Sequence, residues 1–169
     1  ALGSQYEFGP SLDDSVTPHF GRGCFGHAVG EWTDDTSMAM PLLQALARGD
    51  SLDDAAVLAR VVGEWREWSK TALDVGTQTR SVLSQLRDPI TEQATVEVSR
   101  MVHDRMGRSG GNGSLMRTGP LALGYLDRSP ADLAVAAARV ARLTHWEDDN
   151  ADASALWCLA IRHAVLTGV

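Results

Sequence analysis

Thr33, Asp34 and Asp35 stand just before a run of apolar residues at helical spacing, so a hydroxyl and two carboxylates fall on the opening turn of a helix. Such oxygens are hard ligands of the kind that Mg²⁺ and Mn²⁺ prefer. The segment also has a structural explanation, because threonine caps helices and the helix dipole favours acids in the first turn by about 0.3–1 kcal/mol. Three oxygens leave an octahedral cation incomplete. The segment therefore predicts either a capped helix or part of a divalent-cation site that needs further ligands.

A second candidate is the segment 108–117, Arg-Ser-Gly-Gly-Asn-Gly-Ser-Leu-Met-Arg. Its three glycines let the backbone approach a ligand closely, and consecutive N–H groups can hold an anion such as a diphosphate. The segment matches neither the phosphate-binding P-loop, which ends in Gly-Lys-Ser/Thr, nor the dinucleotide fingerprint, which follows a strand. A glycine-rich turn between two helices is the plain alternative.

Two further positions carry single reactive groups. Asp74 begins the segment Asp-Val-Gly-Thr-Gln-Thr, and His145 stands between Thr144 and an acidic run. Asp74 is interpreted either as a helix end or as a reactive carboxylate, and His145 either as a group that satisfies the last carbonyls of a helix or as a pocket residue. No role is assigned to the isolated histidines, which are His19, His27, His103 and His163.

The elements that must position these groups are helical. Apolar residues recur at helical spacing along nearly the whole chain, and no clear alternation predicts a strand, so the fold class is all-α. Ser51 with Asp54 predicts a helix start, and Ser129-Pro130-Ala131-Asp132 predicts another. Further helices are expected over about 79–86, 90–106 and 149–166, with the Ser129 helix reaching about Leu143. The loops that should carry chemistry are 19–33, 74–78, 107–120 and 144–150.

Composition narrows the classes further. The chain has 169 residues, 15 basic and 22 acidic, for a net charge of −7, and 44% of it is hydrophobic. This excludes disordered and collagen-like chains, gives no membrane-spanning stretch, and argues against direct nucleic-acid binding, which needs a clustered positive face. The only cysteines, Cys24 and Cys158, lack the spacing of a zinc or disulfide framework, so a reducing, cytoplasmic location is expected.

In their order along the chain, these motifs resemble the ADP-ribosylglycohydrolase family. The matching segments are Ala1-Leu2-Gly3 with Tyr6-Glu7-Phe8, Gly30 to Met40, Asp74 to Thr79, Gly111 to Leu123, and Leu143 to Gly168. The resemblance implies an all-α fold and metal-dependent hydrolysis of the bond between ADP-ribose and a modified protein side chain or small acceptor. Any one motif is weak alone, but together they cover nearly the whole chain.

The resemblance also implies roles for single residues. Thr33, Asp34 and Asp35 would bind two divalent cations, Mg²⁺ or Mn²⁺. Asp35, Asp74 and Glu7 would take part in catalysis, Glu7 as a mobile acid near the metal and Asp74 at the reacting ribose. The pocket for the ribose and diphosphate would be lined by Ser109, Gly110, Gly111, Asn112, Gly113 and His145.

Three features depart from the family pattern, and one of them is the unusually acidic segment 146–149 that follows His145. Pro41 should interrupt and kink the helix that presents the aspartates, because proline removes one backbone hydrogen bond. A second metal motif, Asp-x-Asp-Thr, is expected by resemblance after Gly168 and does not occur there. We therefore expect residues 1–169 to form a single domain truncated at both ends, with a companion chain or a longer product supplying the rest. A non-catalytic ADP-ribose-binding relative and an unrelated helical interaction domain are the alternatives.

Overall fold

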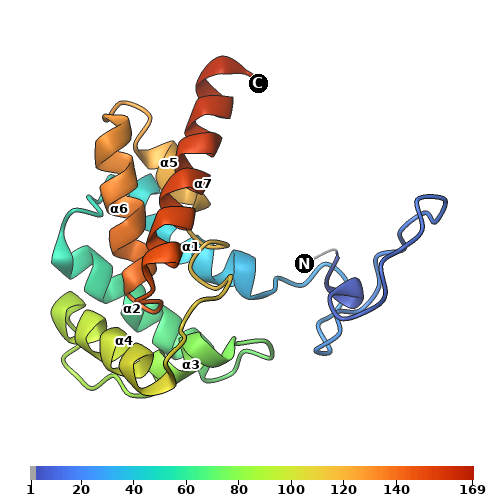
Figure 1. Cartoon of the computed structure of the whole chain (residues 1–169), viewed down its shortest axis with the longest axis horizontal. Coiled ribbons are helices and arrows are strands. Elements are labelled where there is room, and N and C mark those ends of the chain that lie inside the picture. The colour runs from blue at the N-terminus through green and yellow to red at the C-terminus, as the bar shows by residue number, and fades with distance from the viewer. Residues whose placement is uncertain (1–2) are drawn as a thin grey trace.

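The computed structural model describes residues 3–169, and within them it contains helices and loops but no strand. The predicted all-α class is therefore confirmed. Seven α-helices follow a short 3₁₀ helix (Figure 1); they are η1 (Ser4–Tyr6), α1 (Asp34–Ala47), α2 (Ala55–Ser69), α3 (Thr77–Leu83), α4 (Glu92–Met106), α5 (Gly119–Gly124), α6 (Pro130–Arg142) and α7 (Asp148–Thr167). None of these helices is long and apolar enough to span a membrane.

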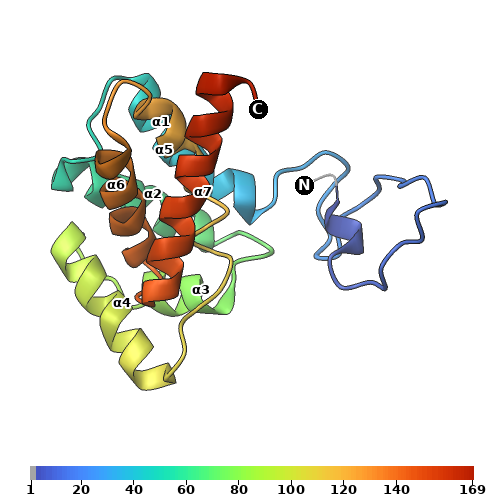
Figure 2. The ribbon, with the colours of Figure 1, turned by 45° about the horizontal axis from the view of Figure 1, so that its top comes forward.

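The seven helices pack together, while much of the segment before α1 projects away from them as a long loop (Figures 1 and 2). The pair α6 and α7 makes the most extensive helix contact, and α5 packs against both α1 and α7. Helix α2 lies against α1, α3 and α4. The packed helices therefore hold four segments in place: the starts of α1, α3 and α7, and the loop after α4.

The core forms around an apolar stripe of α2. Leu58, Val61, Val62 and Trp65 are completely buried, and Trp68 packs half-buried against the same cluster. The Trp65 indole Nε1 donates to the backbone carbonyl of Met38 on α1 over 2.8 Å. A tryptophan gains most from burial when its N–H also finds a partner, so this bond fixes α1 against α2.

The helix start predicted at Ser129 is confirmed, whereas the start predicted at Ser51 is displaced. Helix α6 begins directly after Ser129, and the structure adds a full capping box between Ser129 and Asp132. The start predicted at Ser51 is wrong: Asp54 is the cap, its carboxylate accepting from the Ala56 N–H. Residues 51–54 form a turn in which the Asp54 N–H bonds to the Ser51 carbonyl, so Ser51 begins the turn and not the helix.

Other boundaries differ by a few residues. Helix α3 begins at Thr77 and ends at Leu83, and α5, which was not predicted, begins at Gly119, inside the predicted loop 107–120. The prediction that Pro41 interrupts its helix is wrong, because α1 continues through it to Ala47. Pro41 is buried against the core, and packing there holds the helix together despite one missing N–H.

Candidate functional site

A cavity of about 580 Å³ lies where the predicted motifs meet. Such a volume falls within the range of small-molecule sites. Its lining comes from segments far apart in the sequence: Glu7, Phe8, Phe25, Asp34, Asp35, residues 73–79, Met106, residues 108–113, Met116 and His145. All predicted site residues line it except Thr33, which is buried behind Asp35.

The acidic wall of the cavity is built at the start of α1. The Asp34 N–H donates to Asp74 Oδ2 over 2.8 Å, so Asp74 satisfies a free N–H at the helix start. Thr33 occupies the cap position without making a side-chain cap. Its hydroxyl donates instead to Asp35 Oδ2 over 3.2 Å. The simple capping explanation of Thr33 is therefore wrong, and the threonine orients Asp35.

The charge on this wall is poorly compensated. Burial raises the pKa of Asp34 to about 6, and the neighbouring carboxylates of Asp74, Asp35 and Glu7 act in the same direction. Acids crowded in this way disfavour their own charged forms unless a cation joins them. The wall is therefore suited to a ligand or ion that brings positive charge.

His27 is a site residue that the sequence did not reveal. Its side chain is only 4% exposed, and Nε2 lies 3.3 Å from Asp74 Oδ2. The other ring nitrogen, Nδ1, is buried without a hydrogen-bond partner in the described structure. Nothing in the spacing relates His27 to Asp74, because only the fold brings residues 27 and 74 together.

A complete metal site is not assembled within residues 3–169. No group of three or more His, Cys, Asp or Glu side chains there is arranged to hold an ion. The donor chemistry nevertheless fits Mg²⁺ or Mn²⁺, since Asp34 and Asp35 offer crowded carboxylates to the cavity. The metal set Thr33, Asp34 and Asp35 remains a prediction.

The glycine-rich loop forms the opposite wall, and neighbouring side chains hold it. The Ser109 N–H donates to Glu147 Oε1 over 2.7 Å, and the Ser109 hydroxyl shares a 2.7 Å hydrogen bond with His103 Nδ1. Asn150 Nδ2 donates to the Gly111 carbonyl over 2.7 Å, and its Oδ1 accepts from the Gly111 N–H at 3.4 Å. Glu147, Asn150 and His103 are further residues that the sequence analysis left without a role.

These contacts narrow the prediction that consecutive N–H groups of the loop hold an anion. The amides of Ser109 and Gly111 already have acceptors within the protein. Those of Asn112 and Gly113 donate to no acceptor in the described structure. Arg108 is the only arginine or lysine among the described residues that line the cavity. An anionic ligand is thus best received by Arg108 and the later half of the loop.

His145 forms the floor beneath this loop. A Cβ atom at Gly113 would lie 2.9 Å from His145 Cε1 and 3.1 Å from Thr79 Oγ1, which is why the loop needs glycine there. Burial, with a smaller contribution from nearby Arg117, lowers the pKa of His145 to about 3, so the ring is neutral near pH 7. Its Nδ1 shares a 2.8 Å hydrogen bond with Thr144 Oγ1.

An acidic wall that faces a glycine-rich loop across one cavity defines a site for a ligand with an anionic part and a positively charged or metal-assisted reacting end. The chain belongs to the ADP-ribosylglycohydrolase family, whose model matches residues 1–169. The sequence resemblance is therefore confirmed.

Two curated relatives share the name ADP-ribosylarginine hydrolase Tri1. The protein from Pseudomonas putida (strain GB-1) is 33% identical over 128 residues, which are 73% of this chain and 32% of the relative. The protein from Serratia proteamaculans (strain 568) is 34% identical over 89 residues, 50% of this chain and 24% of the relative. The chain thus spans about a third or less of the relatives it matches, and the comparisons give no support for a companion chain. No solved structure matches the chain significantly.

Proposed function

We propose that this chain forms the ADP-ribose-binding part of a hydrolase that cleaves the glycosidic bond between ADP-ribose and an arginine side chain of a protein. The observation that carries the proposal is the single cavity that unites Asp34, Asp35 and Asp74 with the glycine-rich loop. The family match and the relatives' names supply the substrate class. The reaction would reverse ADP-ribosylation.

The loop side binds the diphosphate and a ribose. Arg108 provides the positive charge, and the free amides of Asn112 and Gly113 provide hydrogen-bond donors. His145 is neutral and buried, so it shapes the pocket without adding charge. Backbone donors held in advance lose little freedom when an anion binds.

The acidic side carries the reaction. Asp74 is oriented by the Asp34 N–H and by His27, so its carboxylate is held at one angle beside the cavity. A water molecule attacks the anomeric carbon, and the bond from that carbon to the guanidine nitrogen breaks. The proton of the water passes to a carboxylate such as Asp74, which then gives it to the departing guanidine nitrogen. The positively charged transition state at the sugar is stabilised by nearby carboxylates.

Thr33, Asp34 and Asp35 are the residues that would hold divalent cations, with Asp35 also close to the reaction. When bound, such a cation would coordinate hydroxyl oxygens and lower the pKa of a bound water molecule. The raised pKa of Asp34 supports this assignment, because a nearby cation would remove the repulsion among the acids.

We also propose that residues 1–169 act as one domain unit of the family fold and work in the cytoplasm. Both cysteines are free, Cys24 exposed and Cys158 buried, which agrees with a reducing compartment. ADP-ribosylated protein is the proposed partner, and a small ADP-ribosyl compound uses the same cavity.

The proposal is tested by two measurements. The 169-residue chain should bind ADP-ribose in calorimetry, and Gly113→Val should abolish binding because the new side chain collides with His145. Gly119→Ala is the control, since a Cβ there makes only an ordinary contact at 3.5 Å with Ile161. The complete gene product should release ADP-ribose from an ADP-ribosylated arginine peptide, and a chelator should stop release. Absence of ADP-ribose binding would refute the proposal.

A second candidate is an ADP-ribose-binding relative without hydrolysis, which fold and family alone permit. It is favoured by the lack of a three-residue metal group within residues 3–169. Binding of ADP-ribose without release from any substrate by the complete gene product, in Mg²⁺ or Mn²⁺, would decide for this alternative.

A further inference from the structure

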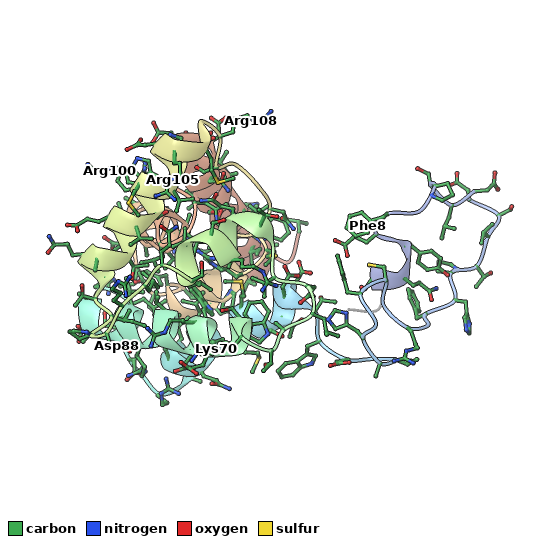
Figure 3. All side chains as sticks on the ribbon, turned by 90° about the horizontal axis from the view of Figure 1, so that it is seen from below. Phe8, Lys70, Asp88, Arg100, Arg105 and Arg108 are labelled. Atoms are coloured by element: carbon green, nitrogen blue, oxygen red, sulfur yellow. The ribbon has the colours of Figure 1, made fainter. Side chains whose placement is uncertain are left out.

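Two phenylalanines stand exposed at the acidic end of the cavity. Phe8 is 74% exposed and Phe25 is 42% exposed, and both line the cavity. Their ring centroids lie 5.6 Å apart with the planes at 89°. Figure 3 labels Phe8 on the N-terminal segment, well apart from Arg108 beside α4. Aromatic rings left open to solvent on a cavity rim offer their faces to a ligand.

A carboxylate accompanies the two rings. Glu7 precedes Phe8 and lines the same cavity, and the Cys24 thiol beside Phe25 lies 3.7 Å from Glu7 Oε2. The cavity's arginine belongs to the glycine-rich loop, so no lysine or arginine among the described lining residues accompanies Glu7 in the N-terminal segment. Aromatic faces next to an unpaired carboxylate form the arrangement that recognises a planar cation, above all a guanidinium group.

We propose that Phe8, Phe25 and Glu7 form an acceptor subsite that binds the guanidinium group of the ADP-ribosylated arginine. The inference rests on the proposed function and assigns its specificity to these three residues. A cation gains from the ring faces and from the carboxylate, whereas a neutral hydroxyl-linked acceptor, such as ADP-ribosylserine, gains from neither. The subsite therefore selects arginine adducts.

The test measures binding by calorimetry in a chelator, where no turnover consumes the ligand. The chain should bind ADP-ribosylarginine about 5-fold to 30-fold more tightly than ADP-ribose, the range for cation–π contacts between exposed and desolvated sites. ADP-ribosylserine should show no such gain. Phe8→Ala and Phe25→Ala should remove the gain, measured in each variant as the ratio of its affinities for ADP-ribosylarginine and ADP-ribose.

Three controls separate recognition from folding. Phe20→Ala removes a ring of similar exposure, 45%, from the same segment outside the cavity lining, and should keep the gain. Phe8→Trp should keep the gain because it retains an aromatic face, whereas Phe8→Leu should lose it although it retains apolar volume. The thermal unfolding temperature should be unchanged in all three controls, since Phe8 and Phe20 are both exposed.

The outcomes distinguish failure of the proposed function from failure of the acceptor subsite alone. If ADP-ribose itself does not bind, both the proposed function and the subsite are refuted. If ADP-ribose binds and the arginine adduct binds no better, or if Phe8→Leu keeps the full gain, the acceptor subsite alone is refuted.

Discussion

At the scale of single residues, Asp74 joins the parts of the acidic wall. One of its oxygens, Oδ2, receives the Asp34 N–H and faces His27 Nε2. The same carboxylate therefore stabilises the start of α1 and, in the proposed reaction, accepts a proton. These two roles require different properties, because the first needs only an acceptor and the second needs an ionisable group.

Two substitutions at Asp74 separate these roles. Asp74→Asn keeps an acceptor for the Asp34 N–H, so stability should change little, while hydrolysis by the complete gene product should fall about 100-fold or more with the loss of proton transfer. Asp74→Ala should also lower the free energy of unfolding by about 0.5–2 kcal/mol, as for a lost cap. Rate assays and thermal unfolding measure both effects. An unchanged rate in Asp74→Asn would show that Asp74 is structural only.

His145 should make stability depend on pH. Its folded pKa of about 3 lies below the ordinary histidine value of 6.5, so between these two pH values the unfolded chain binds a proton that the folded chain does not bind. Stability is therefore fully present above about pH 6.5 and is lost as the pH falls toward 3, by at most about 1.4 kcal/mol per pH unit.

The measurement is urea unfolding of the wild type and of His145→Gln from pH 4 to 8. For each protein, the free energy of unfolding is plotted against pH. The carboxylates titrate in both proteins, so the difference between the two slopes reports the histidine alone. If the free energy of unfolding depends equally on pH in both proteins between pH 4 and 6.5, the imidazole is protonated as readily in the folded chain as in the unfolded chain.

At the scale of elements, the start of α7 acts as a brace for the glycine-rich loop. Glu147 stands at the cap position of α7 but makes no cap to its own helix. Its carboxylate instead accepts the N–H of Ser109, which is the main reason that its pKa is lowered. Asn150, one turn later, holds both polar backbone groups of Gly111.

Removing this brace should weaken ligand binding. Glu147→Ala leaves the buried Ser109 N–H without a partner, an effect of about 1–3 kcal/mol, and the loosened loop should bind ADP-ribose about tenfold more weakly. Glu147→Gln should lose less, because its amide oxygen still accepts. Calorimetry gives the affinity and hydrogen exchange of residues 109–113 gives the loop order.

Asp148→Ala provides the matched control for the brace. Asp148 is an acid in the same turn, but it pairs with Arg142 and does not touch the loop. Its substitution should leave ADP-ribose affinity unchanged. Equal losses in Glu147→Ala and Asp148→Ala would mean that charge near α7, and not the contact with Ser109, governs binding.

At the scale of the whole molecule, the all-α class and the helix start at Ser129 were predicted correctly, whereas the local signals at Ser51 and Pro41 gave wrong predictions. The helical class and the start at Ser129 depend on spacing and neighbours within one helix, whereas the packing that keeps α1 continuous at Pro41 does not. The cavity depends on contacts between distant segments, such as His27 with Asp74 and Ser109 with Glu147, which no spacing encodes. The family resemblance located most of the lining, and the structure supplied the groups that hold it.

The position of Arg117 is another feature that the sequence did not reveal. Its guanidinium lies 4.2 Å from the centroid of the Trp65 ring and donates to the Val140 carbonyl, and burial lowers its pKa to about 9. The sequence placed Arg117 in a ligand-binding motif. The structure places it in the core, where it joins the loop after α4 to α2 and α6 and adds positive charge behind His145.

Because the cavity is lined from the start of α1, from α3 and from the loop held by α7, a ligand that fills it should stabilise the whole fold. ADP-ribose at 100 times its dissociation constant should add about 2.7 kcal/mol to the free energy of unfolding, which corresponds to a rise in Tm of about 5–10 °C for a chain of this size. Inorganic diphosphate should give a smaller rise at equal concentration, because it reaches only the loop side. Gly113→Val should show no rise with either ligand, since the valine occupies the space beside His145. Equal rises with diphosphate and ADP-ribose would mean that only the loop binds the ligand and that the acidic wall does not take part.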